Sequence, residues 1–322
     1  MNMKTIGVLT SGGDAPGMNA AVRSVVRSAI EKGLKVKGIV HGYHGLINGE
    51  IIDLDIRSVS GILDRGGTFL YSARCPEFKT EEGVLKAVES CKKFGIDGMV
   101  VIGGDGSFRG ARDLSLRGIP CIGIPGTIDN DITSTEYTIG FDTAMNTAME
   151  MVDKLRDTSQ SHDRCSVIEV MGRRAGDIAL QVGIATGATA ILVPEVEVDV
   201  ERDVIARIEA GKKLGKNHFI ILVAEGIGKV DELAKTIEER TGVESRATVL
   251  GHIQRGGNPT VRDRVMASQM GYAAVELLSQ GIGNRVICYR KSEILNEDIY
   301  EALAMDKKFD DDMFEIAHKI SI

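Results

Sequence analysis

The sequence lacks tryptophan, and aromatic residues make up only 4% of its 322 residues. It also lacks any apolar stretch near the roughly 18 to 20 residues that span a bilayer; Phe219 to Ala224 is among the longest. The N-terminal apolar stretch follows a single lysine and is interrupted by Gly7, which is a poor match to a signal peptide. We therefore expect a cytoplasmic protein with no membrane partner.

Long runs of one charge are absent as well, since five successive like charges occur nowhere. Lysine and arginine number 39 against 46 aspartate and glutamate residues, a net charge of −7. This balance argues against non-specific nucleic-acid binding. The five cysteines are an odd number without a Cys-x-x-Cys pair, so we expect reduced thiols rather than disulfides or a zinc site.

Linkers, low-complexity segments and internal repeats are also missing. A hydrophobic fraction of 43% with 26% charged residues is that of an ordinary globular protein. At about 150 residues per domain, the 322 residues predict two domains. Any boundary between them is then a crossing within folded structure.

Short apolar runs alternate with glycine-bearing turns and amphipathic segments. The runs predict buried parallel strands at Thr5 to Thr10, Val36 to Val40, Gly98 to Ile102, Cys121 to Ile124, Ser166 to Val170, Ala190 to Val193, Phe219 to Ala224, Ala247 to Leu250 and Arg285 to Tyr289. The segments between them predict helices at Gly17 to Lys32, Thr80 to Phe94, Phe141 to Arg156, Val200 to Lys213, Val230 to Thr241 and Pro259 to Gln280. The alternation indicates an α/β fold, in which ligands bind beyond the carboxyl ends of strands.

Glycine is the one residue type in clear excess, at 38 of 322 or about 12% against a usual value of about 7%. After the first strand comes a loop that reads SGGDAPG, from Ser11 to Gly17. Its glycines let backbone amides approach an anion, and the helix N-terminus that follows adds the positive end of its dipole. The loop is neither G-x-G-x-x-G nor a Walker A motif, and a tight structural turn is the alternative.

Two further loops add carboxylates. The loop after the strand ending at Ile102 places Asp105 among glycines, which suits Mg²⁺ bound together with phosphates; a helix cap is the alternative. In the next loop, PGTIDND, Asp129 and Asp131 share one face if the segment is extended. Like charges that close raise one pKa and favour a general base, whereas a merely solvated carboxylate is the alternative for one of them.

Cationic residues lie near the ends of later strands, namely Arg164, Arg173, Arg246, His252 and Arg255. Together they suit a phosphorylated substrate, and surface salt bridging is the alternative for any one of them. Arg23 and Arg27 lie four apart on the first helix and share a face. They form either a second anion site or a solvated basic face.

These loops give the chain a close resemblance to the bacterial ATP-dependent 6-phosphofructokinase family from Lys4 to the C-terminus. The motifs that carry it are, in order, SGGDAPGMNAAVR, GGDGS, PGTIDND, EVMGRRAGD and GHIQRGG. The resemblance implies transfer of the ATP γ-phosphoryl group to the 1-hydroxyl of fructose 6-phosphate, giving fructose 1,6-bisphosphate and ADP in the committed step of glycolysis. It implies two doubly wound, Rossmann-like three-layer α/β domains with largely parallel sheets. The ATP-binding domain would comprise residues 1–140 plus about 255–305, and the fructose 6-phosphate-binding domain residues 141–254 plus about 306–322.

The resemblance also implies roles for individual residues. ATP would be bound by Gly13, Tyr43, Arg74, Cys75, Gly104, Asp105, Gly106 and Ser107, with Asp105 as the Mg²⁺ ligand. Asp129 would be the base and Arg173 the transition-state cation, beside Thr127 and Asp131. The sugar would contact Thr127, Asp129, Met171, Gly172, Arg173 and Glu225, and its 6-phosphate Arg164, Arg246, His252 and Arg255. In the family, Arg164 and Arg246 come from a neighbouring subunit, so a homotetramer with shared active sites is expected.

Two sets of positions bear on donor and regulation. Pyrophosphate-using relatives carry Asp and Lys where this chain has Gly106 and Gly126, so ATP is the expected donor. The family's site for ADP and phosphoenolpyruvate is matched at Arg23, Arg27, Arg156, Gly187, Lys216 and His218. Thr189 replaces its usual acidic residue, and Leu214 and Ile56 replace usual basic ones. We therefore expect ADP to activate weakly or not at all.

Three other functions compete with this interpretation. A kinase of the same superfold acting on tagatose 6-phosphate would use the same phosphate-binding residues. A catalytically silent sugar-phosphate sensor would be expected to lose Asp105, Asp129 or Arg173, and all three are present. A nicotinamide dehydrogenase is disfavoured because the dinucleotide fingerprint is missing.

Overall fold

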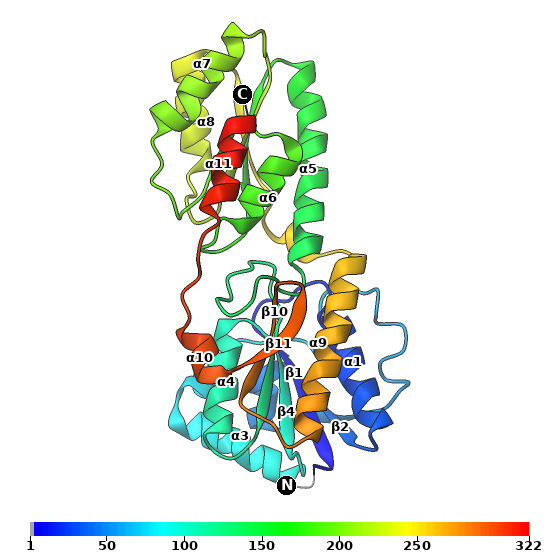
Figure 1. Cartoon of the computed structure of the whole chain (residues 1–322). Helices are drawn as coiled ribbons and strands as arrows, with labels where there is room; N and C mark the ends of the chain where they lie inside the picture. The colour runs from blue at the N-terminus through cyan, green and yellow to red at the C-terminus, as the bar shows by residue number, and fades with distance from the viewer. Residues whose placement is uncertain (1–2, 322) are drawn as a thin grey trace. The chain divides into compact units, whose positions relative to one another are not determined.

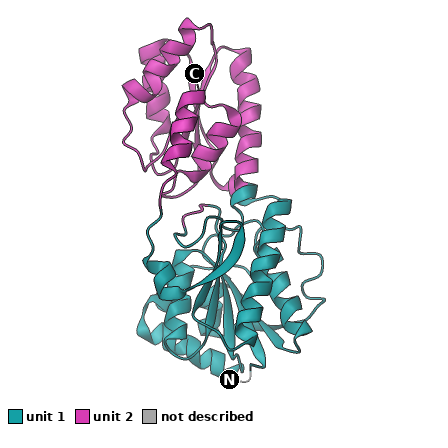
Figure 2. Ribbon diagram, in the orientation of Figure 1, with its two compact units in different colours: residues 1–128, 132–143, 255–307 teal, residues 129–131, 144–254, 308–322 magenta. Residues whose placement is uncertain are grey.

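The computed structural model describes residues 3–321 and shows an α/β protein with two compact units (Figure 2). Unit 1 comprises residues 1–128, 132–143 and 255–307, and unit 2 comprises residues 129–131, 144–254 and 308–322. Residues 1, 2 and 322, at the ends of the expected domain ranges, lie outside the described part of the chain. Each unit is built on its own mostly parallel sheet, which confirms the predicted fold class.

Unit 1 contains a seven-stranded sheet (Figure 1). In spatial order its strands are β11 (Glu293–Asp298), β10 (Arg285–Arg290), β5 (Cys121–Pro125), β4 (Gly98–Gly103), β1 (Thr5–Ser11), β2 (Lys35–Ile39) and β3 (Ile51–Leu54). Only β3 and β11, at the two edges, run antiparallel to their neighbours. The central strands β1, β4 and β5 are buried at every residue, as expected for strands covered on both faces.

Helices cover both faces of this sheet. On one face α1 (Met18–Glu31) and α9 (Val261–Ser279) pack against each other. The other face carries α2 (Gly42–Asn48), α3 (Glu81–Lys93), α4 (Asp105–Ser115) and α10 (Ile299–Ala304), with the short helix η1 (Pro76–Lys79). In α1 the buried residues Met18, Val22, Val25 and Ala29 recur at three- and four-residue spacing, which places them on one apolar stripe.

Unit 2 contains a fully parallel four-stranded sheet. Its order is β7 (Ala190–Leu192), β8 (Phe219–Ala224), β6 (Cys165–Val170) and β9 (Ser245–Val249). The helical elements that lie mostly or wholly in unit 2 are α5 (Phe141–Ser161), which begins in unit 1, α6 (Asp177–Thr186), the π-helical turn η2 (Glu201–Ile205), α7 (Ala206–Lys213), α8 (Val230–Thr241), η3 (Gly251–Arg255), whose last residue belongs to unit 1, and α11 (Asp311–Ile320). Over residues 3–321 no helix is both long and apolar enough to cross a membrane.

The predicted strands and helices are present, but the edges of the unit 1 sheet were missed. β3 is short and half exposed, and β11 has acidic side chains at three of its six positions, so neither has the apolar run of a buried strand. The β10–β11 turn uses Lys291 and Ser292 at positive φ, without the glycine or asparagine that usually marks a tight hairpin. Helix α6 was missed because it is apolar on nearly all sides and shows no helical period.

Candidate active site

Three of the predicted loops lie at one edge of the unit 1 sheet. The last residues of β1, β4 and β5 are in register, with Ser11 beside Gly103 and Gly103 beside Pro125. The amide of Gly126 donates to the carbonyl oxygen of Gly103 at 3.0 Å. The chain order reverses between β1 and β4, since β2 lies on the far side of β1. This is the point at which open parallel sheets bind ligands.

Glycine is required for different reasons at different places in these loops. A Cβ on Gly13 would overlap the guanidinium group of Arg255. Gly12, at φ 87°, has a left-handed backbone that other residues rarely adopt. Gly106 has neither constraint, because nothing lies within 4 Å of the position its Cβ would take. Its lack of a side chain leaves open space beside Asp105.

Asp105 begins α4 and follows the N-cap residue Gly104, so it is not itself the helix cap. Its carboxylate pairs with Arg109 one turn later, at 2.9 Å between Oδ2 and Nη2, and both side chains are largely exposed. Among residues 3–321 no cluster of three or more His, Cys, Asp or Glu side chains could hold a metal. Asp105 offers a single exposed carboxylate, and Mg²⁺ generally takes one or two carboxylates together with phosphate oxygens.

Tyr43, Arg74 and Cys75 belong to segments beside these loops. The Tyr43 hydroxyl donates to the carbonyl oxygen of Ser107 at 2.6 Å, and its ring is buried against Phe78. Tyr43 thus holds the backbone that follows β4 through this hydrogen bond to Ser107. Arg74 and half-buried Cys75 follow Ser72, whose hydroxyl donates to the carbonyl oxygen of Gly12 at 2.6 Å, so this stretch runs along the first glycine loop.

The loop after β5 is not extended as predicted. Asn130 has φ 51°, in the left-handed region, and the chain turns between Asp129 and Asp131. The expectation that these two aspartates share a face as in a strand is therefore wrong. Asparagine tolerates this backbone better than most residues, and the side-chain amide of Asn130 donates to the carboxylate of Asp177 at 3.3 Å. Asp129 is buried, with 7% of its surface exposed.

In unit 2, the loop after β6 is held by polar groups from two other strand ends. Glu225, just after β8, accepts from the amides of Gly172 and Arg173. Gln254, fully buried in η3, accepts from the amide of Met171 at 2.9 Å. Arg173 takes a left-handed backbone at φ 59°, and its guanidinium group lies 3.6 Å from Asp131 while the side chain stays 69% exposed.

The remaining cationic residues do not all join this group. His252 is exposed in η3 at the same edge of the unit 2 sheet, whereas Arg255 lies in unit 1 against Gly13. Arg164 precedes β6 and Arg246 is the second residue of β9, so both lie at the amino edge. At about 3.3 Å per residue, β6 separates Arg164 from Arg173 by roughly 20 Å. The cations were expected together at strand ends, but in unit 2 they lie at opposite edges of the sheet: Arg164 and Arg246 at the amino edge, and Arg173 and His252 at the carboxyl edge.

Glu244 brings Arg164 and Arg246 together. Its carboxylate lies 3.0 Å from Arg164 Nε and 2.5 Å from Arg246 Nη2. Hydrogen bonds from Arg164 and then Arg246 lower the pKa of Glu244. The two arginines are thus held as a pair on the surface.

Most of the predicted effector residues also lie at this amino edge. Arg156 donates to the carbonyl oxygen of Thr186, next to Gly187, and Lys216 Nζ donates to Thr189 Oγ1 at 3.1 Å. Burial and the charge of Arg156 lower the pKa of Lys216. Burial, Arg156 and Lys216 lower the pKa of His218, while Asp163 raises it. Arg23 and Arg27 belong to α1 in unit 1.

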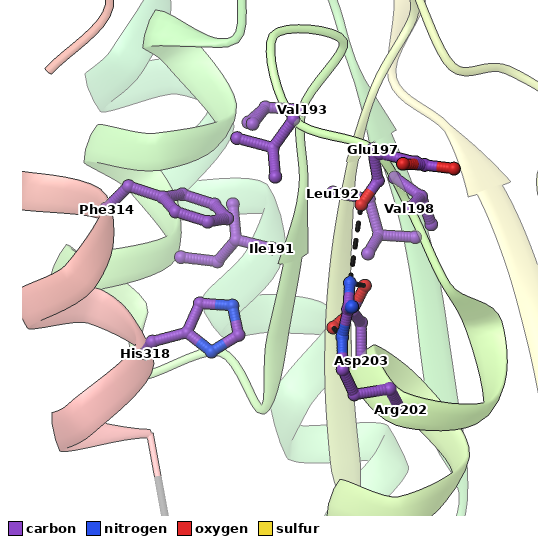
Figure 3. Close-up of a pocket in the computed structure, with 10 residues that line it drawn as sticks. Ile191, Leu192, Val193, Glu197, Val198, Arg202, Asp203, Phe314 and His318 are labelled. Atoms are coloured by element: carbon purple, nitrogen blue, oxygen red, sulfur yellow. Dashed lines mark hydrogen bonds and ion pairs between the residues drawn. The ribbon is translucent and has the colours of Figure 1, made fainter. Parts of the chain in front are cut away.

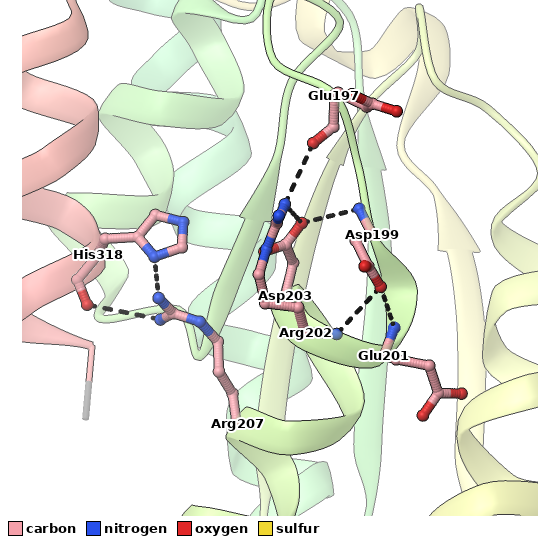
Figure 4. Close-up of polar contacts among 7 residues, drawn as sticks. All are labelled: Glu197, Asp199, Glu201, Arg202, Asp203, Arg207 and His318. Carbon is pink, nitrogen blue, oxygen red and sulfur yellow. Dashed lines mark hydrogen bonds and ion pairs between the residues drawn. The ribbon is translucent and has the colours of Figure 1, made fainter.

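A cavity of about 230 Å³ in unit 2 lies outside all predicted residues. Figure 3 shows Phe314 and His318 of α11 facing Ile191 of β7 across it. Two of its charged groups are paired, since Arg202 Nε lies 2.7 Å from Asp203 Oδ1, and Figure 4 shows their neighbours. Arg207 donates to the His318 ring and to the Ser321 hydroxyl and so fastens the end of α11. We assign this cavity no role in the reaction.

Comparison with known proteins places these features in one family. Residues 5–278 match the phosphofructokinase family. The chain is 58% identical over 319 residues to the ATP-dependent 6-phosphofructokinase of Clostridium botulinum (strain Loch Maree / Type A3), covering 99% of this chain and 100% of the relative. It is 57% identical over 320 residues to the enzyme of the same name from Bacillus thuringiensis (strain Al Hakam), with the same coverage.

A solved structure agrees. The phosphofructokinase of Saccharomyces cerevisiae superimposes with a TM-score of 0.88 at 34% identity, over 93% of this chain and 45% of the yeast chain. The resemblance of the motifs is thereby confirmed over nearly the whole sequence. The chain belongs to the phosphofructokinase family.

Proposed function

We propose that this chain transfers the γ-phosphoryl group of ATP to the 1-hydroxyl of fructose 6-phosphate, giving fructose 1,6-bisphosphate and ADP. The observation that carries the proposal is the meeting of three loops at the point where strand order reverses in unit 1. They occur in a chain whose relatives at 57–58% identity are named ATP-dependent 6-phosphofructokinase. This is the committed step of glycolysis, and a glycolytic enzyme is expected in the cytoplasm.

We assign ATP binding to unit 1. The phosphates lie along the amides of the loops after β1 and β4, where Gly13 and Gly104 permit close approach. Arg74 and Cys75, on the stretch beside the first loop, border the nucleotide. Asp105 ligates Mg²⁺, which when bound neutralises charge on the transferring phosphoryl group. The exposed pair between Asp105 and Arg109 is weak and easily exchanged for the metal.

We assign sugar-phosphate binding to unit 2. Asp129 accepts the proton of the attacking 1-hydroxyl, and Asp131 and Thr127 orient the reacting groups. Arg173 stabilises charge on the equatorial oxygens, which is the main task in phosphoryl transfer. Glu225 and Met171 line the sugar, and His252 and Arg255 hold its 6-phosphate.

Arg164 and Arg246 complete the phosphate site of a neighbouring subunit in a homotetramer. Their position at the opposite edge of the sheet from Arg173 supports this, since one chain does not bring them to the same ligand. The cations around Thr189 form the effector site for ADP or phosphoenolpyruvate. Because Thr189 offers no carboxylate to an effector-bound Mg²⁺, we expect less than tenfold activation by ADP at subsaturating fructose 6-phosphate.

The test is the initial rate with fructose 6-phosphate and Mg²⁺, comparing ATP with pyrophosphate. We expect activity with ATP alone, and a loss of about 10²- to 10⁴-fold in kcat in Asp129→Asn, the usual contribution of a general base. Gly106→Asp is the sharper control, because the space around Gly106 is open and the fold should accept the side chain. We expect it to raise the KM for ATP without a large fall in Tm.

The outcomes separate the alternatives. Activity with pyrophosphate would show that Gly106 and Gly126 do not decide the donor. A higher kcat/KM with tagatose 6-phosphate would identify another substrate. Absence of activity with either donor and either sugar would contradict the proposal in favour of a sensor.

A further inference from the structure

Unit 1 contains a buried carboxylate that belongs to none of the residues assigned to ATP, to the sugar phosphate or to the effector. Asp263, in the first turn of α9, is fully buried. It accepts hydrogen bonds from the amides of Gly140 at 2.7 Å and Thr143 at 2.9 Å, from the Thr143 hydroxyl at 2.5 Å and from the Tyr137 hydroxyl. The donors are spaced three residues apart, so one carboxylate fixes the whole segment 137–143.

The middle of that segment pairs with the loop after β5. The Ile139 amide donates to the carbonyl oxygen of Pro125 at 2.9 Å, and the Thr127 amide donates to the carbonyl oxygen of Ile139 at 3.1 Å. The Thr138 hydroxyl donates to the carbonyl oxygen of Thr127 at 2.7 Å. The backbone amide and carbonyl of Thr127 therefore bind Ile139 and Thr138, two residues that lie between the points held by Asp263.

The same carboxylate also lies beside the first glycine loop. A Cβ on Gly17 would lie 2.7 Å from Ile139 Cγ2 and 3.4 Å from Asp263 Cβ, so the end of this loop packs directly on the held segment. Gly140, at φ 102°, is equally close to the loop, because a Cβ on it would lie 2.6 Å from the Cβ of Ala15. A shift of the segment would thus be felt in two loops of the proposed site.

Packing alone does not explain a carboxylate here. Burial raises the pKa of Asp263, and the hydrogen bonds from Thr143 and Tyr137 lower it only in part. The guanidinium group of the preceding residue, Arg262, lies over the Tyr137 ring, 4.6 Å from its centroid. A charged group without an ion pair is costly in the interior, and its gain is rigid, charge-assisted hydrogen bonding of the segment.

We propose that Asp263 is a positioning residue for phosphoryl transfer, which acts through segment 137–143 to fix Thr127 and the chain that leads to Asp129. The inference rests on the proposed function, because Thr127 matters to it only as part of the catalytic loop. Asp263 itself is fully buried and is not among the residues that we assign to the substrate or the nucleotide. Its loss should therefore lower kcat while leaving the KM for ATP nearly unchanged.

The experiment compares the whole enzyme with Asp263→Asn. Asparagine keeps the size of the side chain but replaces one acceptor oxygen with an NH₂ group. The donors of segment 137–143 that bind that oxygen then lose their hydrogen bonds. We expect kcat to fall about 10- to 100-fold, as for a displacement of about 1 Å at a reacting group, with the KM for ATP within about twofold. Hydrogen exchange at the Thr127 amide should accelerate, which needs no activity to observe.

Thr80→Ala is the matched control for stability. Thr80 caps α3 through a 3.1 Å bond from the Gly83 amide, far from the segment along the chain. It should lower Tm without changing kcat or exchange at Thr127. If Asp263→Asn behaves in the same way, Asp263 is merely structural and the proposal is overturned.

A double mutant shows whether Asp263 acts through Thr127. In the background Thr127→Val, Asp263→Asn should lower kcat by much less than in the wild type, whereas independent effects would contradict the mechanism. If Asp263→Asn does not fold, Tyr137→Phe removes one donor and should show a smaller fall in kcat with the same pattern. A wild type that phosphorylates no sugar phosphate with ATP refutes the proposed function, while an active wild type with unaltered variants refutes only this inference.

Discussion

At the carboxyl edge of the unit 2 sheet Arg173 extends from a loop whose backbone Glu225 holds, whereas at the amino edge Glu244 binds the guanidinium groups of Arg164 and Arg246 themselves. In the first arrangement the carboxylate fixes the chain and leaves the arginine side chain 69% exposed. In the second it fixes the guanidinium groups of the two arginines themselves. The first arrangement suits a charge that develops during reaction, as we propose for Arg173, and the second suits a charge that is present throughout, as we propose for Arg164 and Arg246.

This difference predicts different kinetic effects at the two edges. A cation that acts on developing charge contributes mainly to kcat, and one that binds a permanent phosphate contributes mainly to KM. The weak 3.6 Å pair between Arg173 and Asp131 suits the first role. Surface pairs such as Arg164 with Glu244 are worth about 0 to 1 kcal/mol, so a phosphate can replace Glu244 at little cost.

The largest effect is expected for Arg173→Gln. Loss of one donor to the transition state lowers kcat by about 10²- to 10³-fold, with a smaller change in the KM for fructose 6-phosphate. Steady-state kinetics measure both. Arg174→Gln is the matched control, because Arg174 is the adjacent exposed arginine and takes part in none of the site's contacts described here. Equal losses in the two variants would contradict the role of Arg173.

An intermediate effect is expected at the amino edge. Arg164→Gln and Arg246→Gln should each raise the KM for fructose 6-phosphate by about 10- to 100-fold, the usual range for a hydrogen bond to a charged group, with kcat little changed. Arg240→Gln, which breaks another exposed pair of unit 2, is the control.

Mixing subunits tests where these arginines act. In hybrids of Arg164→Gln with Asp129→Asn chains, some sites would combine the intact Arg164 of one subunit with the intact Asp129 of another. Refolded mixtures should therefore recover a low fructose 6-phosphate KM for part of the activity. Mixtures that behave as the sum of the two parent enzymes would contradict shared sites.

Much of this contrast could be predicted from the order of residues. Arg164 precedes a predicted strand and Arg173 follows it, and parallel strands put those positions at opposite edges. The residues that hold the loops could not be found in this way. Gln254 and Asp263 bind amides 83 and 123 residues away in the chain, and such contacts leave no local period. The left-handed backbones of Asn130 and Arg173 were missed for a different reason, because neither residue is glycine, the usual sign of a positive φ.

The smallest effect concerns the cations around Thr189, at the same edge as Arg164. Burial first, then the charges of Arg156 and Lys216, lower the pKa of His218. Arg156→Met should therefore raise the His218 pKa, and NMR titration of the ring measures it. Asp163→Asn should lower the His218 pKa, because Asp163 raises it.

An anion that binds among Arg156, Lys216 and His218 would also raise the His218 pKa, since it offsets the positive charges that lower it. Phosphoenolpyruvate and ADP without Mg²⁺ should both do so in the wild type. If neither moves the titration, the amino edge binds no effector, and its cations serve the neighbouring subunit alone.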